Sequence, residues 1–237
     1  MRVSRRLRYQ VAVSLDGFIA GPKGEHDWIV MDPSIDFRAL FGEFDTAVMG
    51  RKTYAVLAAQ GEGGALPGLD VVVFSRSLAP ATRPGVRIVP DDPSQVVAEL
   101  KQKPGRDIWL YGGGALFRSL LDAGLVDTVE LAVMPVLLGA GIPVLPAGTA
   151  AKLTLADQKT LPASGIVAVT YTVPGGRGPA PRIGWVKAPA RGRRRGVGDK
   201  PSPSARARKG GAKPVTRRKR PKGGTSAPRR KGRSPRS

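Results

Sequence analysis

A short run of small, cationic and hydroxyl-bearing residues follows one of the apolar segments of the sequence. Gly50 comes directly after Val48-Met49, and it precedes Arg51, Lys52 and Thr53. The unpaired N–H groups and the positive dipole at the start of a helix attract anions, and two cations strengthen that attraction. The run is therefore a candidate phosphate-binding junction between a strand and a helix.

Two further strand ends carry similar chemistry. The run Gly112-Gly113-Gly114 separates an apolar segment from Ala115-Leu116-Phe117. Residues without a Cβ let the backbone approach a phosphate closely and adopt positive φ. Ser75 and Arg76 end another apolar run with a hydroxyl and a guanidinium. Three such ends in one sheet suggest a dinucleotide with several phosphates, although each one alone also fits a turn with a solvated basic residue.

Apolar runs that alternate with amphipathic segments predict the elements that position these residues. Continuous apolar runs suit strands covered on both faces, and strands separated by helices favour a parallel sheet with crossovers. The expected strands are 7–14, 46–49, 70–75, 86–89, 107–111, 128–136 and 166–173. The expected helices are 33–44, with a cap at Asp32-Pro33, and 53–60, 93–102 and 115–123. No clear helix separates the last two strands, so they should form an antiparallel edge.

Charge divides the chain near Val173. Residues 1–173 hold 17 Lys and Arg against 17 Asp and Glu, whereas residues 174–237 hold 22 against the single Asp199. Pro and Gly make up 22 of those last 64 residues, so the segment cannot bury enough apolar surface to offset its backbone entropy. We expect a domain over 1–173 and a disordered tail over 174–237. The tail either binds nucleic acid without sequence preference or has no function.

The composition excludes several classes of protein. The chain has no cysteine, which excludes a disulfide scaffold, a zinc finger, an iron–sulfur site and a thiol nucleophile. The one histidine, His26, excludes a multi-histidine metal site. No apolar run reaches the roughly 18–20 residues that span a bilayer, and no signal peptide is evident. The expected location is the cytoplasm.

Six short segments follow one another along the chain in an order that is typical of one protein family. They are Ser14-Leu15-Asp16-Gly17-Phe18-Ile19-Ala20, Asp27-Trp28-Ile29, Met49-Gly50-Arg51-Lys52-Thr53-Tyr54, Tyr111-Gly112-Gly113-Gly114, Leu125-Val126-Asp127 and Met134-Pro135-Val136-Leu137-Leu138-Gly139-Ala140-Gly141-Ile142-Pro143. Over about residues 7–173 the chain resembles the dihydrofolate-reductase-like superfamily, most closely the reductase domain at the carboxyl end of bacterial riboflavin-biosynthesis deaminase-reductases. The resemblance implies an α/β fold with a mostly parallel sheet, an antiparallel carboxyl-terminal edge and flanking helices.

The resemblance also implies an NADPH-dependent reductase. Backbone groups of Ala12 and Ile19 are then expected to face the nicotinamide carboxamide, with Trp28 nearby. The remaining implied contacts are those of Gly50, Arg51, Lys52 and Thr53 with the adenosine phosphates, of Ser75 and Arg76 with the 2′-phosphate, and of Gly112, Gly113, Gly114, Ala115, Leu116 and Phe117 with the pyrophosphate. The last three groups coincide with the junctions found from the residues alone.

Hydride transfer depends on positioning, and the reduced substrate also needs a proton from an acid or a water. Asp27 or Asp36 could orient a substrate amine or relay that proton, and the resemblance places Tyr111 beside the substrate. Asp16 is another candidate carboxylate near the cleft, and its alternative role is to hold the backbone of its own loop. His26 is either solvated or in contact with substrate.

The sequence also departs from the riboflavin enzymes. It has no cysteines for their zinc deaminase domain, and it lacks the Asp-Asp-Pro segment and arginine that follow their first junction, with no basic residue between Lys52 and Arg76. Two substrate classes fit the sequence, a small heterocycle and a ribosylaminopyrimidine. An alternative function is that the protein binds NADPH without catalysing a reaction. We expect a homodimer through residues 129–145 and the final strand, although burial inside one subunit would also explain that apolar run.

Overall fold

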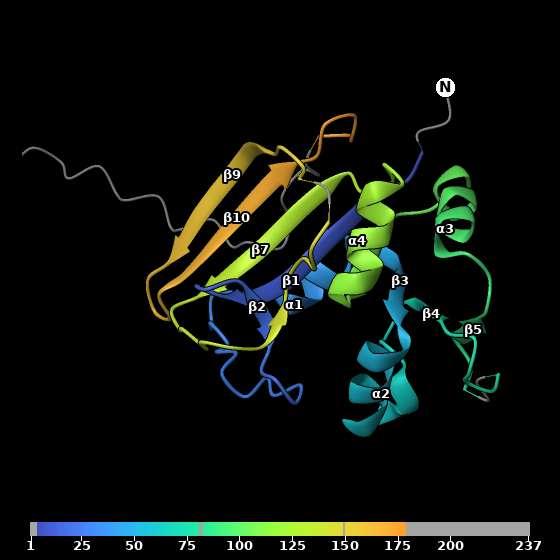
Figure 1. Cartoon of the computed structure of the whole chain (residues 1–237), viewed down its shortest axis with the longest axis horizontal. Helices are drawn as coiled ribbons and strands as arrows, with labels where there is room; N and C mark the ends of the chain where they lie inside the picture. The colour runs from blue at the N-terminus through green and yellow to red at the C-terminus, as the bar shows by residue number, and fades with distance from the viewer. Residues whose placement is uncertain (1–3, 81–82, 149, 179–237) are drawn as a thin grey trace, which may run out of the picture. The chain divides into compact units, whose positions relative to one another are not determined.

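The computed structural model of the chain describes residues 4–80, 83–148 and 150–178, and most of its strands form one sheet. These strands are β1 (Leu7–Ser14), β3 (Phe44–Gly50), β4 (Asp70–Phe74), β5 (Val86–Val89), β6 (Asp107–Gly112), β7 (Thr128–Met134), β9 (Thr154–Leu161) and β10 (Ile166–Thr172). Their order across the 8-stranded sheet is β5-β4-β3-β6-β1-β7-β10-β9 (Figure 1). Neighbouring strands from β5 to β7 pair in parallel. β10 pairs antiparallel with β7 on one side and with β9 on the other. The predicted α/β fold class is confirmed.

Helices and a small second sheet complete the described part of the chain. The helices are α1 (Phe37–Phe41), α2 (Arg51–Ala59), α3 (Pro93–Gln102) and α4 (Gly114–Asp122), with a short 3-10 turn at Glu62–Gly64. β2 (Phe18–Ala20) pairs with β8 (Ile142–Pro143) in an antiparallel two-stranded sheet. α3 has its predicted bounds, because Asp92 accepts a hydrogen bond from the Ser94 N–H at 2.8 Å and a proline starts the helix.

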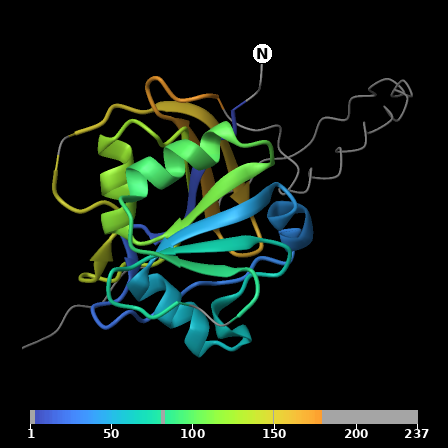
Figure 2. The same cartoon turned by 90° about the vertical axis from the view of Figure 1, so that its right-hand side faces the viewer.

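Helices cover both faces of the sheet, as Figure 2 shows. On the face of α3 and α4, Tyr9 of β1 stacks on Phe117 of α4 with ring centroids 3.9 Å apart. On the opposite face, side chains of α1 and α2 pack against a cluster that contains Phe44, Met49 and Trp109. Successive residues of a strand point to opposite faces, so each central strand contributes to both cores. Two-sided burial explains the continuous apolar runs of the sequence.

Ion pairs hold the amino-terminal edge of the sheet. Arg6 pairs with Asp107 at 2.8 Å, and Lys101 of α3 pairs with Asp127 at 2.5 Å. Asp127 also accepts a hydrogen bond from the Leu7 N–H at 2.7 Å. Asp107 and Asp127 therefore have structural partners.

One predicted helix is much shorter than expected. The sequence predicted a helix over 33–44 with a cap at Asp32, but α1 begins at Phe37 and its N-cap is Asp36, whose carboxylate accepts a first-turn N–H at 3.0 Å. Asp32 is instead buried, and it accepts hydrogen bonds from the hydroxyl of Ser164 at 2.6 Å and from its N–H at 3.1 Å. Ser164 lies in the turn between β9 and β10, so a distant partner replaces the predicted cap.

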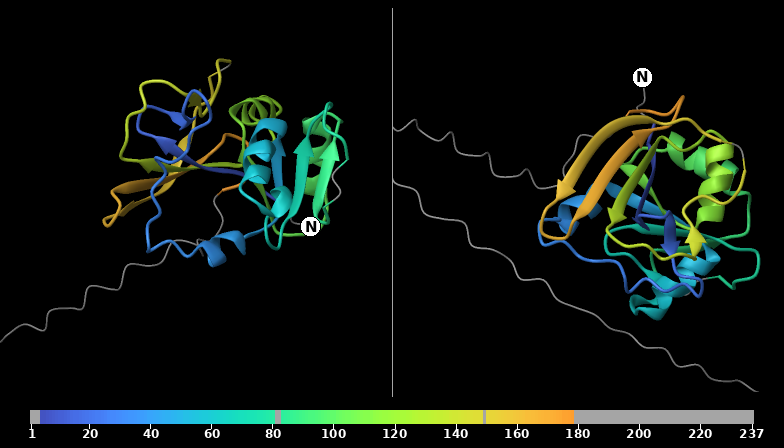
Figure 3. Two further views of the ribbon diagram at one scale, coloured as in Figure 1. Left: turned by 90° about the horizontal axis from the view of Figure 1, so that it is seen from below. Right: turned by 60° about the vertical axis from the view of Figure 1, so that its left-hand side comes forward.

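Three strands were not predicted. β9 is exposed along most of its length and has no apolar run, so no periodic signal marks it. It forms a long antiparallel hairpin with β10 at the edge of the sheet (Figure 3). β2 and β8 have only 3 and 2 residues, and each depends on the other, more than a hundred positions away in the sequence.

The described chain continues past Val173. The backbone N–H of Arg177 donates to Asp127 Oδ1 at 3.0 Å, and its guanidinium donates to the carbonyl oxygen of Ser4 at 2.7 Å. The rest of the predicted disordered tail, residues 179–237, lies outside the described residues. Among the residues that are described, no helix has the length and apolar character that crossing a membrane requires.

Candidate functional site

The three predicted anion-binding junctions lie side by side at the carboxyl edge of the sheet. β4, β3 and β6 are consecutive neighbours, and the pairing register places Gly50 beside Phe74 and Met49 beside Gly112. The chain therefore leaves all three strands at the same edge of the sheet. It continues there with Arg51, with Ser75 and with the glycines 112–114. In parallel α/β sheets this edge is where ligands bind.

Two helices begin at this edge without a side-chain cap. Gly50 is the N-cap of α2 and Gly113 is the N-cap of α4, and neither helix has a side-chain hydrogen bond to its first-turn N–H groups. A Cβ built on Gly113 would lie 3.4 Å from Oγ1 of Thr53, and the φ of Gly113 is +97°, a conformation that favours glycine. The two junctions thus form one cradle of small residues, which fits a pyrophosphate.

Cations surround this cradle. Arg51, Lys52 and Arg76 are all exposed. Hydrogen bonds from Ser94 lower the pKa of Asp92, the N-cap of α3, and the positive charge of Arg76 lowers that pKa further. The hydroxyl of Ser75 accepts hydrogen bonds from the N–H groups of residues 77 and 78 at 3.2 and 3.1 Å, so this side chain also shapes its own turn.

The other predicted cofactor residues have different surroundings. Ala12 pairs with Ala132 in the sheet, and Ile19 lies in β2. The indole N–H of Trp28 donates to the carbonyl oxygen of Glu25 at 3.1 Å. The side chains of Leu116 and Phe117 are buried in the core beneath α4. Ala115, which precedes them in the first turn of α4, is exposed. Leu116 and Phe117 could therefore contact a cofactor only through their backbone.

A cavity of about 370 Å³ lies on the α1 and α2 face of the sheet. Its walls come from β1, β6, β7 and β10, from α1, α2 and from the segment 26–35. Aromatic side chains are prominent among them, and they include Phe37, Phe41, Trp109 and Tyr111. Tyr111 contacts Trp109 edge to face, with ring centroids 4.8 Å apart. The cavity adjoins the cradle, because Tyr111 is followed directly by Gly112.

Polar residues line the floor of this cavity. Glu130 of β7 lies beside Gln10 of β1 in the sheet register, and the Gln10 amide donates to Glu130 Oε2 at 3.2 Å. Arg8 donates to both oxygens of Glu130, at 2.7 and 2.8 Å, and the Thr128 hydroxyl donates at 2.7 Å. Burial alone would lower the pKa of Arg8, but the carboxylates of Glu130 and Glu43 raise it well above its usual range. Arg8 is therefore permanently charged, and its bonds hold Glu130 in place.

The outer wall of the cavity is fastened to α2. His26 Nε2 lies 2.9 Å from the amide nitrogen of Gln60, and His26 Nδ1 lies 3.3 Å from the carbonyl oxygen of Gly24. The amide of Gln60 can only donate through nitrogen, so this geometry assigns the proton of a neutral His26 to Nδ1. Both His26 and Gln60 line the cavity.

Of the three predicted catalytic residues, only Tyr111 lines the cavity. Burial raises the pKa of Tyr111, so its hydroxyl stays protonated at neutral pH. Asp36 caps α1, and Asp27 is exposed on the segment outside the cavity wall. Asp16 accepts hydrogen bonds from Ser14 Oγ at 2.6 Å and from the N–H of Gly139 at 2.7 Å, which matches its alternative role of holding a loop.

Sequence reasoning missed several residues of the cavity. Gln10, Glu130 and Trp109 lie on strands that were predicted, but nothing local assigned them to a site. The available signal was a polar side chain at every second position of an otherwise apolar strand, such as Arg8 and Gln10 in β1. Such residues occur where one face of a strand borders a cavity or an ion pair.

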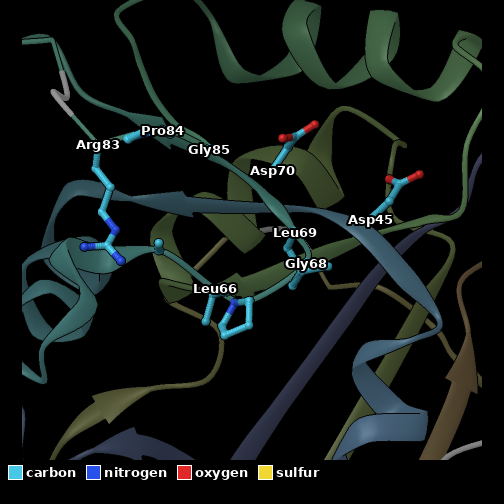
Figure 4. Close-up of a pocket in the computed structure, with 10 residues that line it drawn as sticks. Asp45, Leu66, Gly68, Leu69, Asp70, Arg83, Pro84 and Gly85 are labelled. Carbon is cyan, nitrogen blue, oxygen red and sulfur yellow. The ribbon is translucent and has the colours of Figure 1, made fainter.

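A second depression lies at the opposite edge of the sheet (Figure 4). It encloses about 760 Å³ and is bordered by the loops that precede β4 and β5, with Leu66, Gly68 and Arg83 on its rim. Although larger, it faces the amino ends of parallel strands, and one of its two carboxylates, Asp45, is paired with Arg5. The cavity beside the cradle is the better candidate site.

Comparisons with known proteins match the chain to a family model and to relatives in one organism. Residues 5–167 match the model of the RibD C-terminal domain. The chain is 33% identical over 179 residues to the uncharacterized protein YyaP of Bacillus subtilis (strain 168), which covers 70% of this chain and 94% of that protein. It is also 28% identical over 144 residues to the uncharacterized protein YwjB of the same organism, which covers 60% of this chain and 83% of that protein.

Solved structures share the fold. A putative riboflavin biosynthesis protein from Shewanella sp. PV-4 has a TM-score of 0.62 at 24% identity, covering 71% of this chain and 98% of that one. A diaminohydroxyphosphoribosylaminopyrimidine deaminase/5-amino-6-(5-phosphoribosylamino)uracil reductase from Thermotoga maritima has a TM-score of 0.54 at 18% identity, covering 72% of this chain and 57% of that one.

Proposed function

The chain belongs to the RibD C-terminal domain family, and on that premise we propose that it is an oxidoreductase that uses NADPH to reduce a small heterocyclic substrate. The family is one of reductases of the riboflavin pathway.

One observation carries the proposal, namely that the cavity and the glycine cradle adjoin each other at the carboxyl end of β6. Tyr111 lines the cavity, and Gly112 and Gly113 lie against Thr53 in the cradle. A dinucleotide whose phosphates occupy the cradle can extend along the carboxyl edge to Ala12, which also lines the cavity. The reactive end of such a cofactor then meets whatever the cavity holds, as hydride transfer requires.

The residues of the chain bind and orient, and NADPH supplies the hydride when it is bound. Thr53 and the uncapped N–H groups of α2 and α4 would hold the phosphates, and Arg51 with Arg76 would favour a cofactor with a 2′-phosphate. The protonated hydroxyl of Tyr111 can donate a hydrogen bond to the substrate atom that gains a proton. Glu130 has no such role here, because its two carboxylate oxygens already accept four hydrogen bonds from the protein.

A role of Asp27 or Asp36 in orienting a substrate amine or relaying a proton is also a proposal. Neither lines the cavity, so a proton relay through either one would have to run by way of water outside the wall. Replacing each by asparagine separates the roles: loss of turnover with intact folding supports a relay, and unchanged turnover removes the residue from the mechanism.

The direct test is to mix purified protein with NADPH and follow its oxidation with aminopyrimidines, their ribosyl phosphates, dihydrofolate and small carbonyl compounds. Oxidation that depends on one substrate class supports the proposal. Tight NADPH binding with no turnover across the whole panel would instead favour a protein that binds the cofactor without catalysis.

A homodimer is part of the same proposal. Val167 and Leu155 are 37% and 51% exposed, and they lie on β10 and β9, beyond the part of the sheet that α3 and α4 cover (Figure 1). An apolar sheet surface of this kind commonly packs against a second subunit. Light scattering at micromolar concentration tests it, and a monomer would contradict it.

The charge of the carboxyl-terminal segment supports a second activity. Residues 174–237 hold 22 cations and one anion, so they can neutralise many phosphates of DNA or RNA. The binding is expected to weaken steeply with salt and to show no sequence preference.

A further inference from the structure

We propose that the cavity accepts an uncharged planar ring with N–H donors and discriminates against a phosphorylated substrate. This inference rests on the proposed reductase function, and it names the substrate class of the same site. The 5-amino-6-(5-phosphoribosylamino)uracil named for the Thermotoga maritima enzyme carries a phosphate, so the inference separates this chain from that activity.

The cavity has the size and the walls for one or two stacked rings. Its volume of about 370 Å³ lies near the lower end of the roughly 300–1,000 Å³ typical of small-molecule sites. Phe37 and Phe41 of α1 and the edge-to-face pair of Trp109 and Tyr111 provide aromatic surfaces. Flat rings pack well against such surfaces.

No lysine or arginine occurs among the described residues that line the cavity, whereas phosphate sites use both. Arg8 lies beneath the floor, but its guanidinium is already committed. Its Nε and Nη2 donate to Glu130, and its Nη1 donates to Glu43 at 2.5 Å and to Asp107 at 3.4 Å.

Three carboxylates therefore surround this one guanidinium. Arg6 also pairs with Asp107, so the group holds two cations and three anions. A phosphate above such a floor meets a small excess of negative charge and gains no donor from it.

Gln10 supplies a hydrogen-bond acceptor that the protein leaves unused. The Gln10 amide nitrogen donates to Glu130 Oε2, and this hydrogen bond fixes the position of Gln10 Oε1 on the other side of the amide. That oxygen is buried and has no hydrogen-bond partner among the described residues. The backbone is fixed as well, because the Trp109 indole N–H donates to the carbonyl oxygen of Gln10 at 3.0 Å.

A buried acceptor without a donor is unfavourable, and a ligand N–H removes the deficit. Oε1 is closed off from solvent, so a ring N–H reaches it only when the side chains around it move aside on binding. An amino or imino group of a heterocycle provides that donor, and an N-methylated ring of the same shape does not. Discrimination between such rings is therefore expected to depend on Gln10.

Isothermal titration of the full chain with simple pyrimidines tests the proposal without any need for turnover. We expect 5,6-diaminouracil to bind at least about tenfold more tightly than 1,3-dimethyluracil, which has no N–H donor, a preference typical of one buried hydrogen bond. Uridine and uridine 5′-phosphate form the matched pair for the phosphate, and the phosphate is expected to weaken binding or leave it unchanged.

The variant Gln10→Met removes the acceptor and keeps the length of the side chain, so it should abolish the preference for diaminouracil. Gln158→Met on the exposed strand β9 is the matched control and should retain it. Tighter binding of uridine 5′-phosphate than of uridine overturns the proposal. Equal binding of the two uracils, or no binding of diaminouracil, also overturns it. NADPH titration is a separate measurement, so failure of the reductase proposal is recognised independently.

Discussion

Thr53 of α2 and Gly113, the N-cap of α4, lie so close that a Cβ on the glycine would be 3.4 Å from the threonine hydroxyl. Two loops that are about sixty positions apart in the sequence thereby form one surface. A residue without a side chain keeps the backbone of this surface open to close approach by a phosphate.

Gly113→Ala should weaken NADPH binding by at least about tenfold, roughly 1.4 kcal/mol. The φ of +97° is unfavourable for alanine, and the methyl group would take up the space beside Thr53. Fluorescence titration measures the affinity. Gly124→Ala is the control, because its φ is +66° with no atom near the new methyl group, so it should cost stability without loss of cofactor affinity.

NADPH should bind about tenfold more tightly than NADH, a difference of roughly 1.4 kcal/mol. Arg51 and Arg76 leave adjacent strands at the same edge and present positive charge to a 2′-phosphate. Arg51→Ala should reduce this preference, whereas Lys103→Ala at the carboxyl end of α3 should not. Equal affinities of the two cofactors for the unaltered protein would contradict the prediction.

Tyr111→Phe should lower kcat by about tenfold or more, while the affinity for NADPH stays unchanged. The substitution keeps the ring that packs on Trp109 and removes only the hydroxyl of this cavity-lining residue. Tyr54→Phe removes a hydroxyl that donates to the Gly63 carbonyl outside the cavity, and it serves as the control. An unchanged kcat in Tyr111→Phe would assign proton supply to water alone.

Asp32 should contribute to stability only above acidic pH. Hydrogen bonds from the Ser164 and Ser34 hydroxyls lower the pKa of Asp32 from 3.8 to about 2. A carboxylate with a lowered pKa in the folded protein stabilises it fully above the unfolded value, and this stabilisation is lost as pH falls through the folded value. Acid unfolding should therefore show a component between about pH 4 and pH 2 that Asp32→Asn lacks, as circular dichroism can record.

A chain that ends at Gly178 should fold, keep its affinity for NADPH and lose retention on heparin. It keeps the two hydrogen bonds of Arg177, to Asp127 and Ser4, and it removes nearly all of the excess positive charge. A chain that ends at Val173 loses these bonds, each worth about 1 kcal/mol, and should unfold at lower denaturant concentration. Heparin retention by the shorter chains would show that the charged segment is not what binds.

The elements that local pattern determines were predicted well. β1 and α3 have the expected bounds, because an apolar run defines one and a Pro-containing cap defines the other. The glycine junctions were also located, since residue type alone marks them. By contrast, the helix over 33–44 was wrong because Asp32 bonds to Ser164, and no local pattern reveals that partner.

The cavity floor could not be predicted for a related reason. Gln10 and Glu130 become neighbours through the register of β1 against β7, 120 positions apart in the sequence. A shift of the pairing by one residue would place the two side chains on opposite faces of the sheet. The identity of each residue was visible, but the partnership depends on how the whole sheet assembles.

The bond between Asp32 and Ser164 has a mechanical consequence. The segment from His26 to Asp32 is tied to α2 at one end, through Gln60, and to the hairpin of β9 and β10 at the other. Because the segment is bonded at both ends, a displacement of the hairpin also displaces this wall of the cavity. Anything that stiffens the hairpin should therefore slow the exchange of molecules with the cavity.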